Sequence, residues 1–428
     1  MSRLVVKNGR VIDPANNIDE VRDVAIEDGV IREVAKDIAA NGAPIFDASG
    51  LIVAPGFIDM HVHLREPGFE HAETIESGSR TAAAGGFTSI CCMPNTQPVN
   101  DNPTVTHYIL ERARQKAPVN VFPIGAITKG SKGEELASLA SMKKAGIVAI
   151  SDDGRPVMNA RVVRRAMELA GSLNLPLIEH CEDLNLSAGG NMHEGVESVR
   201  LGLRGIPRAS EDVMVARDIL LAELTGVRYH VAHISSKNAV DMVAYAKKKG
   251  LAVTAEATPH HFDLADKDML PYDSNYKMKP PLREHCDVEA VARGLSSGAI
   301  DAIATDHAPH AGDEKMQEFE RCPFGIIGLE TAIGLSLERL YRTGCLTLPQ
   351  LVEKYTVNPA RILSLDKGTL SPDKAADITI LGLDHEWTYD VNRSPSKSRN
   401  SPYHGRQFQG GPIASITAGQ VVWQLEQL

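Results

Sequence analysis

Eight short apolar segments alternate with amphipathic stretches in the middle of this 428-residue chain, and this alternation constrains the fold most strongly. Amphipathic patterns typical of helices separate most of the segments, for example at residues 161–173, 212–225 and 237–249. Alternating strands and helices imply parallel strands, so eight such units predict a closed α/β barrel of the (β/α)8, or TIM, type over residues 55–365. The expected strands read GFIDMHVHL, TSICCMP, VNVFPIGAI, GIVAISDD, LPLIEHC, RYHVAHIS, AVTAEATPHH and DAIATDHAPH.

The two ends of the chain predict a second, smaller domain. Residues 3–53 and 375–428 contain short runs with alternating apolar residues, which are typical of a small antiparallel sheet or sandwich. Because these runs flank the middle of the chain, we expect residues 1–54 and 366–428 to form one discontinuous β-sandwich domain. Residues 394–411 are rich in Ser, Pro, Asn and Gly and are expected to form a long loop.

Charge and composition argue against several classes of protein. With 55 acidic and 45 basic residues the net charge is −10, which is unfavourable for a general nucleic-acid binder. Charges interrupt every apolar stretch of the N-terminal MSRLVVKNGRVID, and no apolar window approaches the ~18–20 residues of a membrane span. The six cysteines include no CxxC pair, which fits reduced thiols. We therefore expect a cytoplasmic protein that binds neither nucleic acid nor a membrane.

Histidine and aspartate residues stand at the ends of five of the expected strands. In a (β/α)8 barrel the carboxyl ends of the strands meet at one face, where active sites lie. A single buried histidine is more often hydrogen-bonded than metal-bound, but five strand ends carrying such residues together predict a metal centre. These residues are His61 and His63, Asp152 and Asp153, His180, His233, and Asp306 with His307.

The residue types indicate which metal this centre would hold. His61 and His63 alternate on one strand, so both can face the barrel mouth. Imidazole and carboxylate groups without cysteine suit Zn²⁺, with Mn²⁺ or Co²⁺ as substitutes. A catalytic zinc takes about three protein ligands, so the groups suffice for one ion or for two that share a carboxylate. The spacing leaves the choice between Asp152 and Asp153 open.

Longer motifs resemble those of the type I dihydroorotases of the amidohydrolase superfamily, and the resemblance covers essentially the whole chain. It implies a distorted (β/α)8 barrel with a small composite β domain. It also implies a hydrolase of cyclic amides that interconverts N-carbamoyl-L-aspartate and L-dihydroorotate in pyrimidine biosynthesis. The motifs are PGFIDMHVHLREPG (55–68), MPNTQP (93–98), SDDG (151–154), EHCED (179–183), HVAHISS (230–236), TPHH (258–261), ATDHAPH (304–310) and PFGIIGLET (323–331).

The resemblance assigns roles to individual residues, with one or two zinc ions per chain. It makes Asp153, not Asp152, the ligand shared by two metals, and it makes Asp306 both a ligand and the catalytic proton carrier. The remaining ligands it implies are His61 and His63 for the first metal, and His180 and His233 for the second.

The same resemblance implies a set of substrate contacts. Arg65 would bind a carboxylate through its planar guanidinium. The other contacts implied are His63, Asn95, His310, the backbone at Phe324 and Gly325, and position 279. The family usually carries asparagine at that last position, where this chain has Lys279. Either the change is tolerated, or substrate affinity is altered, or the chain is kept as an assembly subunit.

Two alternative functions remain to be compared with this one. Hydantoinase-like relatives bridge their metals with a carboxylated lysine on strand four, but GIVAISDDG has none. A non-catalytic subunit that scaffolds aspartate transcarbamoylase would be expected to lose metal ligands, whereas all six are present here. The partners implied are the small-molecule substrate, with a homodimer and an assembly with aspartate transcarbamoylase left open.

Overall fold

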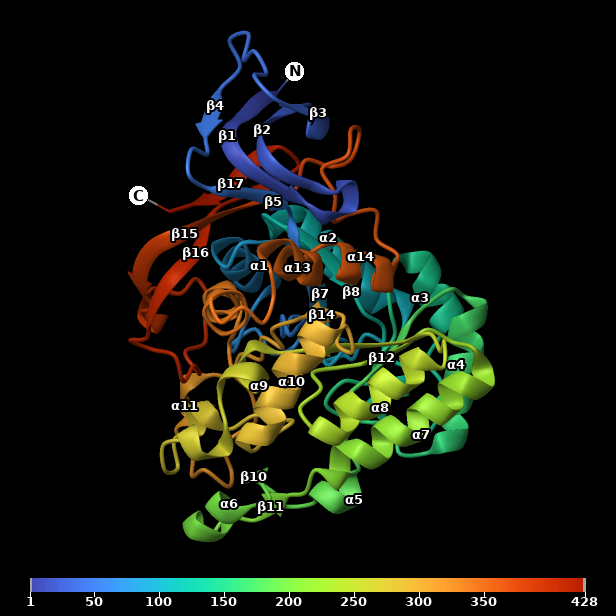
Figure 1. Ribbon diagram of the computed structural model, residues 1–428. Helices are drawn as coiled ribbons and strands as arrows, with labels where there is room; N and C mark the ends of the chain where they lie inside the picture. Colours follow the sequence, from blue (N-terminus) through green and yellow to red (C-terminus); the bar gives the residue numbers. More distant parts are fainter. Residues whose placement is uncertain (1, 426–428) are drawn as a thin grey trace.

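The computed structural model describes residues 2–425 and shows a parallel barrel beneath a sheet built from both ends of the chain (Figure 1). Neighbouring barrel strands pair in parallel in the order of the sequence. Val62 forms a parallel bridge with His307 after the last strand, which closes the barrel. The strands are β6 (Phe57–Val62), β7 (Phe87–Cys92), β8 (Asn120–Pro123), β9 (Leu177–Glu179), β12 (Tyr229–Val231), β13 (Val253–Ala257) and β14 (Ala302–Ile303).

The fourth barrel position differs from the expected strand. Only Ile150 bridges Gly125 on one side and Leu177 on the other, so this strand is reduced to a single residue. The carboxylate of Asp152 accepts hydrogen bonds from the backbone N–H groups of Ile127 and Thr128, which turns the chain out of the ladder. The barrel fold is therefore confirmed, with the fourth strand shorter than predicted.

Helices surround the barrel, and several of them begin at a residue whose side chain caps the first turn. Thr74 caps α1 and exchanges hydrogen bonds with Ser77, and Asn102 precedes the proline that opens α2. The helices expected at residues 161–173, 212–225 and 237–249 are α4, α7 and α8. The longer helices are α1 (Ile75–Ala84), α2 (Pro103–Lys116), α4 (Ala160–Ser172), α7 (Ala209–Thr225), α8 (Lys237–Lys248), α10 (His285–Ser297) and α13 (Leu348–Tyr355). The shorter ones are α3 (Leu139–Ala145), α5 (Leu184–Ser187), α6 (Val196–Leu201), α9 (Pro259–Asp263), α11 (Gly312–Lys315), α12 (Ala332–Ser336) and α14 (Val357–Leu363).

Strands from both ends of the chain form the separate β-sandwich domain, in the order β17-β16-β15-β5-β1-β2-β3 with β4 beside β1. Ile378 pairs with Pro55, so the two halves meet at β5 and β15. Val11, Val53 and Ile380 are neighbours on three adjacent strands and are fully buried in the core of this domain. The strands are β1 (Arg3–Asp13), β2 (Ile18–Glu27), β3 (Val30–Ala35), β4 (Ile45–Asp47), β5 (Ile52–Pro55), β15 (Ile378–Thr388), β16 (Gln407–Thr417) and β17 (Gln420–Gln424). The domain boundaries at residues 54 and 366 remain a prediction.

Two details of this domain correct the sequence expectation. The sheet is mixed, because β4 and β5 run parallel to β1 after the chain crosses over from β3. The long loop ends at residue 406, because residues 407–411 pair with β15 as the start of β16. Pairing across the sheet there overrides the local turn preference of the glycines.

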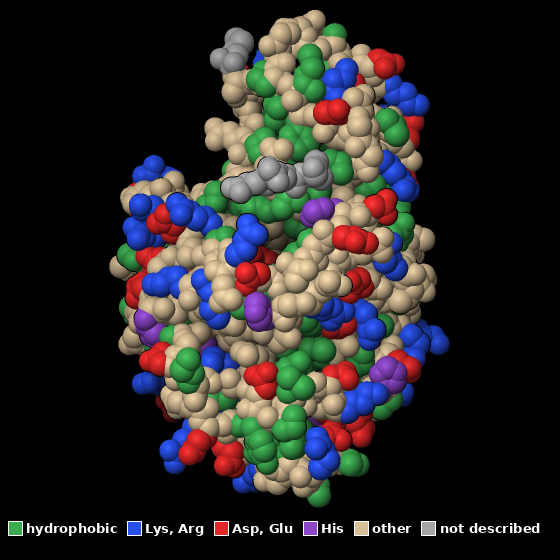
Figure 2. All heavy atoms as spheres, turned by 90° about the vertical axis from the view of Figure 1, so that its left-hand side faces the viewer, with side chains coloured by type: hydrophobic (Ala, Val, Ile, Leu, Met, Phe, Trp, Pro, Cys, Tyr) green, Lys and Arg blue, Asp and Glu red, His purple; other side chains and the backbone are tan. Residues whose placement is uncertain are grey.

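The surface of the molecule carries both charges. On the face shown in Figure 2, basic and acidic side chains are interspersed over the barrel, with apolar side chains gathered near the sheet. Within residues 2–425, no helix combines the length and the apolar character needed to cross a membrane.

Candidate active site

Hydrogen bonds join the end of β6 to the loop after β14. Asp59 accepts hydrogen bonds from the backbone N–H of His61 and from the backbone and hydroxyl groups of Thr305. The backbone N–H of His63 donates to the carbonyl of His307. Asp306 is held at a φ of 45°, a left-handed conformation that residues other than glycine seldom adopt outside constrained sites. These contacts direct the side chains of His61, His63 and Asp306 toward one another.

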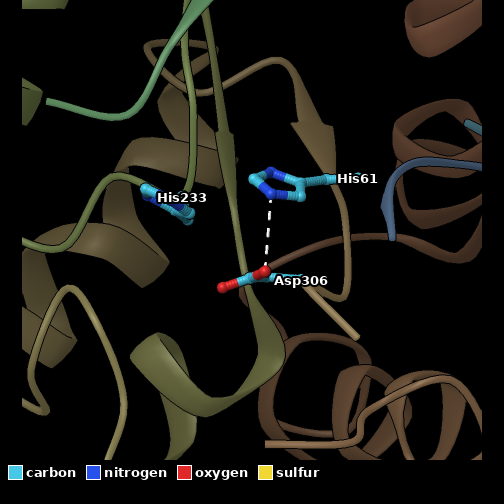
Figure 3. Close-up of side chains that lie close together, drawn as sticks. All are labelled: His61, His233 and Asp306. Carbon is cyan, nitrogen blue, oxygen red and sulfur yellow. Dashed lines mark ion pairs between the residues drawn. The ribbon is translucent and has the colours of Figure 1, made fainter. Parts of the chain in front are cut away.

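Asp306 faces both histidines of the first strand. Its Oδ1 lies 2.9 Å from Nε2 of His63 and 3.4 Å from Nε2 of His61. Figure 3 shows the side chains of His61 and Asp306 directed toward each other, with His233 nearby. His233 belongs to the loop after β12. All three side chains are buried.

Asp153 occupies the centre of the cluster. Its Oδ1 lies 3.4 Å from Nε2 of His61, 3.6 Å from Nε2 of His233 and 3.7 Å from Nδ1 of His180. Its other oxygen lies 3.5 Å from Nε2 of His63. One carboxylate therefore faces four imidazoles. The structure brings together all six residues expected as metal ligands, which are His61, His63, Asp153, His180, His233 and Asp306.

The buried atoms of this cluster fit a bound cation. Nε2 of His61, Oδ1 of Asp153 and Nδ1 of His233 have no hydrogen-bond partner among the residues that the structure describes. Leaving buried polar atoms unpaired is costly. A cation among the three overlapping groups of donor atoms, each spanning at most 4.8 Å, would pair Nε2 of His61 and Oδ1 of Asp153. The cluster is thus compatible with a metal site.

The electrostatics of the cluster keep its carboxylates anionic. Burial alone would raise the pKa of Asp153 and of Asp306, but the neighbouring imidazoles, His61 foremost, hold both below their usual range. The three carboxylates around His61, those of Asp153, Asp306 and Glu256, raise the pKa of its imidazole despite its burial. Anionic oxygens beside imidazole nitrogens are the donors that Zn²⁺ and similar ions prefer.

Glu256 on β13 is a site residue that the sequence reasoning missed. One of its oxygens lies 2.6 Å from Nδ1 of His61 and the other 3.2 Å from Nε2 of His230. The Glu256 carboxylate accepts a hydrogen bond from Nδ1–H of His61, which leaves Nε2 of His61 facing Asp153 and Asp306. The available signal was an acidic residue inside the apolar run AVTAEA, which a buried parallel strand does not otherwise tolerate.

The residues expected to contact substrate line the same mouth. Nε of Arg65 donates to the carbonyl of Pro309 at 3.0 Å, and its Nη2 lies 3.3 Å from Nε2 of His310. That imidazole nitrogen is also 2.8 Å from the carbonyl of Phe324. Burial, followed by the charge of Arg65, lowers the pKa of His310 to about 3, so this imidazole is neutral. Oδ1 of Asn95 lies 2.9 Å from Nδ1 of His63.

Lys279 also lies at this mouth, after β13. Its Nζ is 2.6 Å from Oε1 of Glu182 and 4.8 Å from the centre of the Phe324 ring. The backbone N–H of Gly325 donates to the carbonyl of Lys277, which places the Phe324–Gly325 segment beside the same loop. The structure therefore brings every expected substrate contact to one face of the barrel.

Comparisons with known proteins identify relatives of this chain. Residues 50–239 match the model of a family described as dihydro-orotase-like. The chain is similar to a dihydroorotase of Solibacter usitatus, with 68% identity over 98% of both chains. It is also similar to dihydroorotases of Pelotomaculum thermopropionicum (55% identity over 99% of both chains) and Geobacter metallireducens (51% identity over 98% and 99%).

Solved structures share the fold at lower identity. An L-hydantoinase from Arthrobacter aurescens superimposes with a TM-score of 0.89 at 24% identity, covering 100% of this chain and 97% of that one. A dihydropyrimidinase from Brevibacillus agri gives a TM-score of 0.87 at 23% identity, covering 100% and 96%. At such identity these structures establish the common fold and no more.

Proposed function

The chain belongs to the dihydroorotase family of the amidohydrolase superfamily, and from this premise we propose that it interconverts N-carbamoyl-L-aspartate and L-dihydroorotate in pyrimidine biosynthesis. The observation that carries the proposal is the cluster in which Asp153 faces four buried histidines with Asp306 beside them. An assembly subunit without activity would have no need of such a cluster.

We propose that this cluster holds Zn²⁺, as one or two ions per chain. His61, His63 and Asp306 would hold the first ion, His180 and His233 the second, and Asp153 would be shared. Bound there, zinc supplies a Lewis acid for the amide carbonyl and lowers the pKa of water. The unpaired Nε2 of His61 and Oδ1 of Asp153 support this assignment.

We further propose that Asp306 carries the proton of the reaction. As water adds to the amide carbonyl carbon beside the ring methylene group of dihydroorotate, Asp306 accepts its proton and gives it to the nitrogen between the two ring carbonyls, while the bond between that carbon and that nitrogen breaks. Cyclisation follows the same path in reverse. The low pKa of Asp306 keeps its carboxylate free to accept this proton at neutral pH.

The substrate carboxylate would be bound by Arg65, with Asn95 and His310 beside it. Because His310 is neutral and its Nε2–H faces the Phe324 carbonyl, it orients the Phe324–Gly325 backbone, which we propose lies against the edge of the pyrimidine ring. The proposed setting is the cytoplasm, with a homodimer and an assembly with aspartate transcarbamoylase as further proposals for size-exclusion measurements.

A substrate panel tests the proposed function. Purified, zinc-supplemented protein is assayed with L-dihydroorotate, hydantoin and allantoin under the same conditions. We expect hydrolysis of dihydroorotate, and its formation from N-carbamoyl-L-aspartate, with little turnover of the other two. Preferential turnover of hydantoin or allantoin would assign the chain to another activity, and no turnover of any of them would favour the assembly subunit.

A further inference from the structure

Lys279 forms an ion pair with Glu182 within the protein. Its Nζ lies 2.6 Å from Oε1 of Glu182, whose side chain is 8% exposed, while the lysine side chain is 27% exposed. The two residues come from different loops, after β13 and after β9. In this close ion pair, Glu182 already balances the charge of Lys279 when no substrate is bound.

Glu182 connects that lysine to the metal cluster. Its second oxygen, Oε2, lies 2.9 Å from Nε2 of His180. The other ring nitrogen of His180, Nδ1, is 2.8 Å from Nε2 of His233 and 3.7 Å from Oδ1 of Asp153. A hydrogen on Nε2 directed at Glu182 leaves Nδ1 unprotonated and facing the cluster.

Such an arrangement has a known physical consequence. A carboxylate that accepts the N–H of a ligating histidine fixes its tautomer and the orientation of its ring, and loss of the carboxylate typically costs ~10–100-fold in metal affinity. A largely buried carboxylate needs a cation of its own, because an unpaired buried charge is strongly unfavourable. Lys279 supplies this cation to Glu182, which an uncharged, shorter asparagine at the same position would not.

We propose that Lys279 is a positioning residue that acts through Glu182 on His180, and that it is not a substrate contact. This inference rests on the proposed function, which places His180 in the metal site. Lys279 would then help to hold His180 in place at the second metal position. Its contact with the Phe324 ring, 4.8 Å from Nζ to the ring centre, leaves the ammonium group held between that ring and Glu182.

Metal retention tests the inference without using substrate. Zinc-loaded wild-type protein and the variants Lys279→Met, Glu182→Gln and the double variant are titrated with a zinc chelator. Methionine keeps an apolar stem against Phe324 and removes only the charge. Lys249→Met is the matched control, because Lys249 forms an equally short pair, 2.6 Å, with Glu223 on the surface.

We expect each single variant to lose the more weakly held zinc at roughly 10–100-fold lower chelator concentration. The double variant should lose it no more readily than Glu182→Gln alone, because both act on one path, and Lys249→Met should match wild type. Lys279→Arg keeps charge and reach, so it should stay within about threefold of wild type. The Michaelis constant of Lys279→Met for dihydroorotate should also stay within about threefold.

Two results would overturn the inference. One is wild-type zinc retention in Lys279→Met; if the Michaelis constant also rises tenfold or more, Lys279 is a substrate contact. The other is multiplication of the two single effects in the double variant. Wild-type protein that retains zinc but does not hydrolyse dihydroorotate would defeat the proposed function alone, and wild-type protein that retains no zinc would defeat both.

Discussion

Asp306 combines three properties in one residue: a left-handed backbone, a carboxylate 2.9 Å from His63, and a pKa below its usual range. Exchange for asparagine keeps the shape and one ligand oxygen but removes the proton acceptor. We predict that Asp306→Asn retains zinc and loses at least ~100-fold in turnover in both directions, because the two directions share one transition state. Steady-state assays of hydrolysis and cyclisation, with zinc analysis of the same sample, measure this. Near-normal turnover at full zinc content would show that another group carries the proton, and His310 would be the next candidate.

Arg65 supplies a positive charge to the expected carboxylate site. Its Nε bonds the carbonyl of Pro309, which fixes the guanidinium beside His310. Losing a charge-assisted contact of this kind costs on the order of 2–5 kcal/mol. We therefore predict that Arg65→Ala lowers kcat/KM for dihydroorotate by roughly 30- to several-thousand-fold. Arg112→Ala is the control, because Arg112 pairs with Glu66 at 2.8 Å in the same region. Equal effects of the two variants would remove Arg65 from substrate binding.

Glu256 should act on His61 rather than on the substrate. We predict that Glu256→Gln weakens zinc retention by ~10–100-fold, since an amide cannot accept a hydrogen bond from both His61 and His230 as the carboxylate does. Chelator titration measures the change, and Glu223→Gln on the exposed side of α7 is the control. Retention equal to that of wild type would show that His61 needs no such support.

Some of these site residues can be predicted from the sequence and others cannot. His61, His63, His180, His233 and Asp306 stand at strand ends, where a polar residue after an apolar run is visible in the chain itself. Glu256 and Glu182 were not assigned, because their roles depend on which side chains from other strands lie beside them. Lys279 was visible as a departure from the family pattern, but only the structure shows that Glu182 pairs with it.

At the scale of elements, Glu330 ties the long loop after β15 to the barrel. Its carboxylate accepts hydrogen bonds from the hydroxyls of Ser394 and Tyr389. Burial raises the pKa of Glu330 to about 7 in the folded protein, against an ordinary value of 4.5. The folded state therefore holds this proton more tightly, and the stability it contributes below pH 4.5 is lost as the pH rises through 7.

This predicts a difference in pH dependence between wild type and Glu330→Gln. Between pH 5 and pH 8 the wild type should lose on the order of 2–3 kcal/mol of unfolding free energy relative to the variant, which carries no buried charge. Urea unfolding of both proteins at the two pH values measures it. Parallel pH profiles would mean that Glu330 does not titrate in this range.

Element prediction was good where periodicity is strong and poor where long-range pairing decides. The amphipathic patterns of α4 and α8 predict these helices directly, whereas α7 has a weaker pattern because it also buries Glu211, Asp212 and Asp218. The fourth barrel strand shrinks to Ile150 because Asp152 bonds to the backbone of the preceding β8 region, a contact that no local pattern reveals. Residues 407–411 join β16 for the same kind of reason, since their partners lie on β15.

At the scale of the whole molecule, the two ends of the chain form one sheet, and the residues between them in the sequence form the barrel that lies beneath this sheet (Figure 1). The hydroxyl of Thr379 on β15 accepts from the backbone N–H of Phe57 and donates to the carbonyl of Gly86. The sheet is therefore fastened to β6, the strand that carries His61 and His63. The sequence predicted this division from the β-rich runs at both ends, but it could not predict the strand order.

The central claim is that the buried histidine–aspartate cluster holds the metal on which dihydroorotate turnover depends. The most direct test measures zinc content and dihydroorotate hydrolysis in the same samples of wild type and His61→Ala. We predict one or two zinc ions per wild-type chain with turnover, and in the variant a loss of zinc with abolished turnover, because a site with about three protein ligands does not tolerate losing one imidazole. Wild-type protein that hydrolyses dihydroorotate without zinc or another transition metal, or an active His61→Ala variant, would contradict the account.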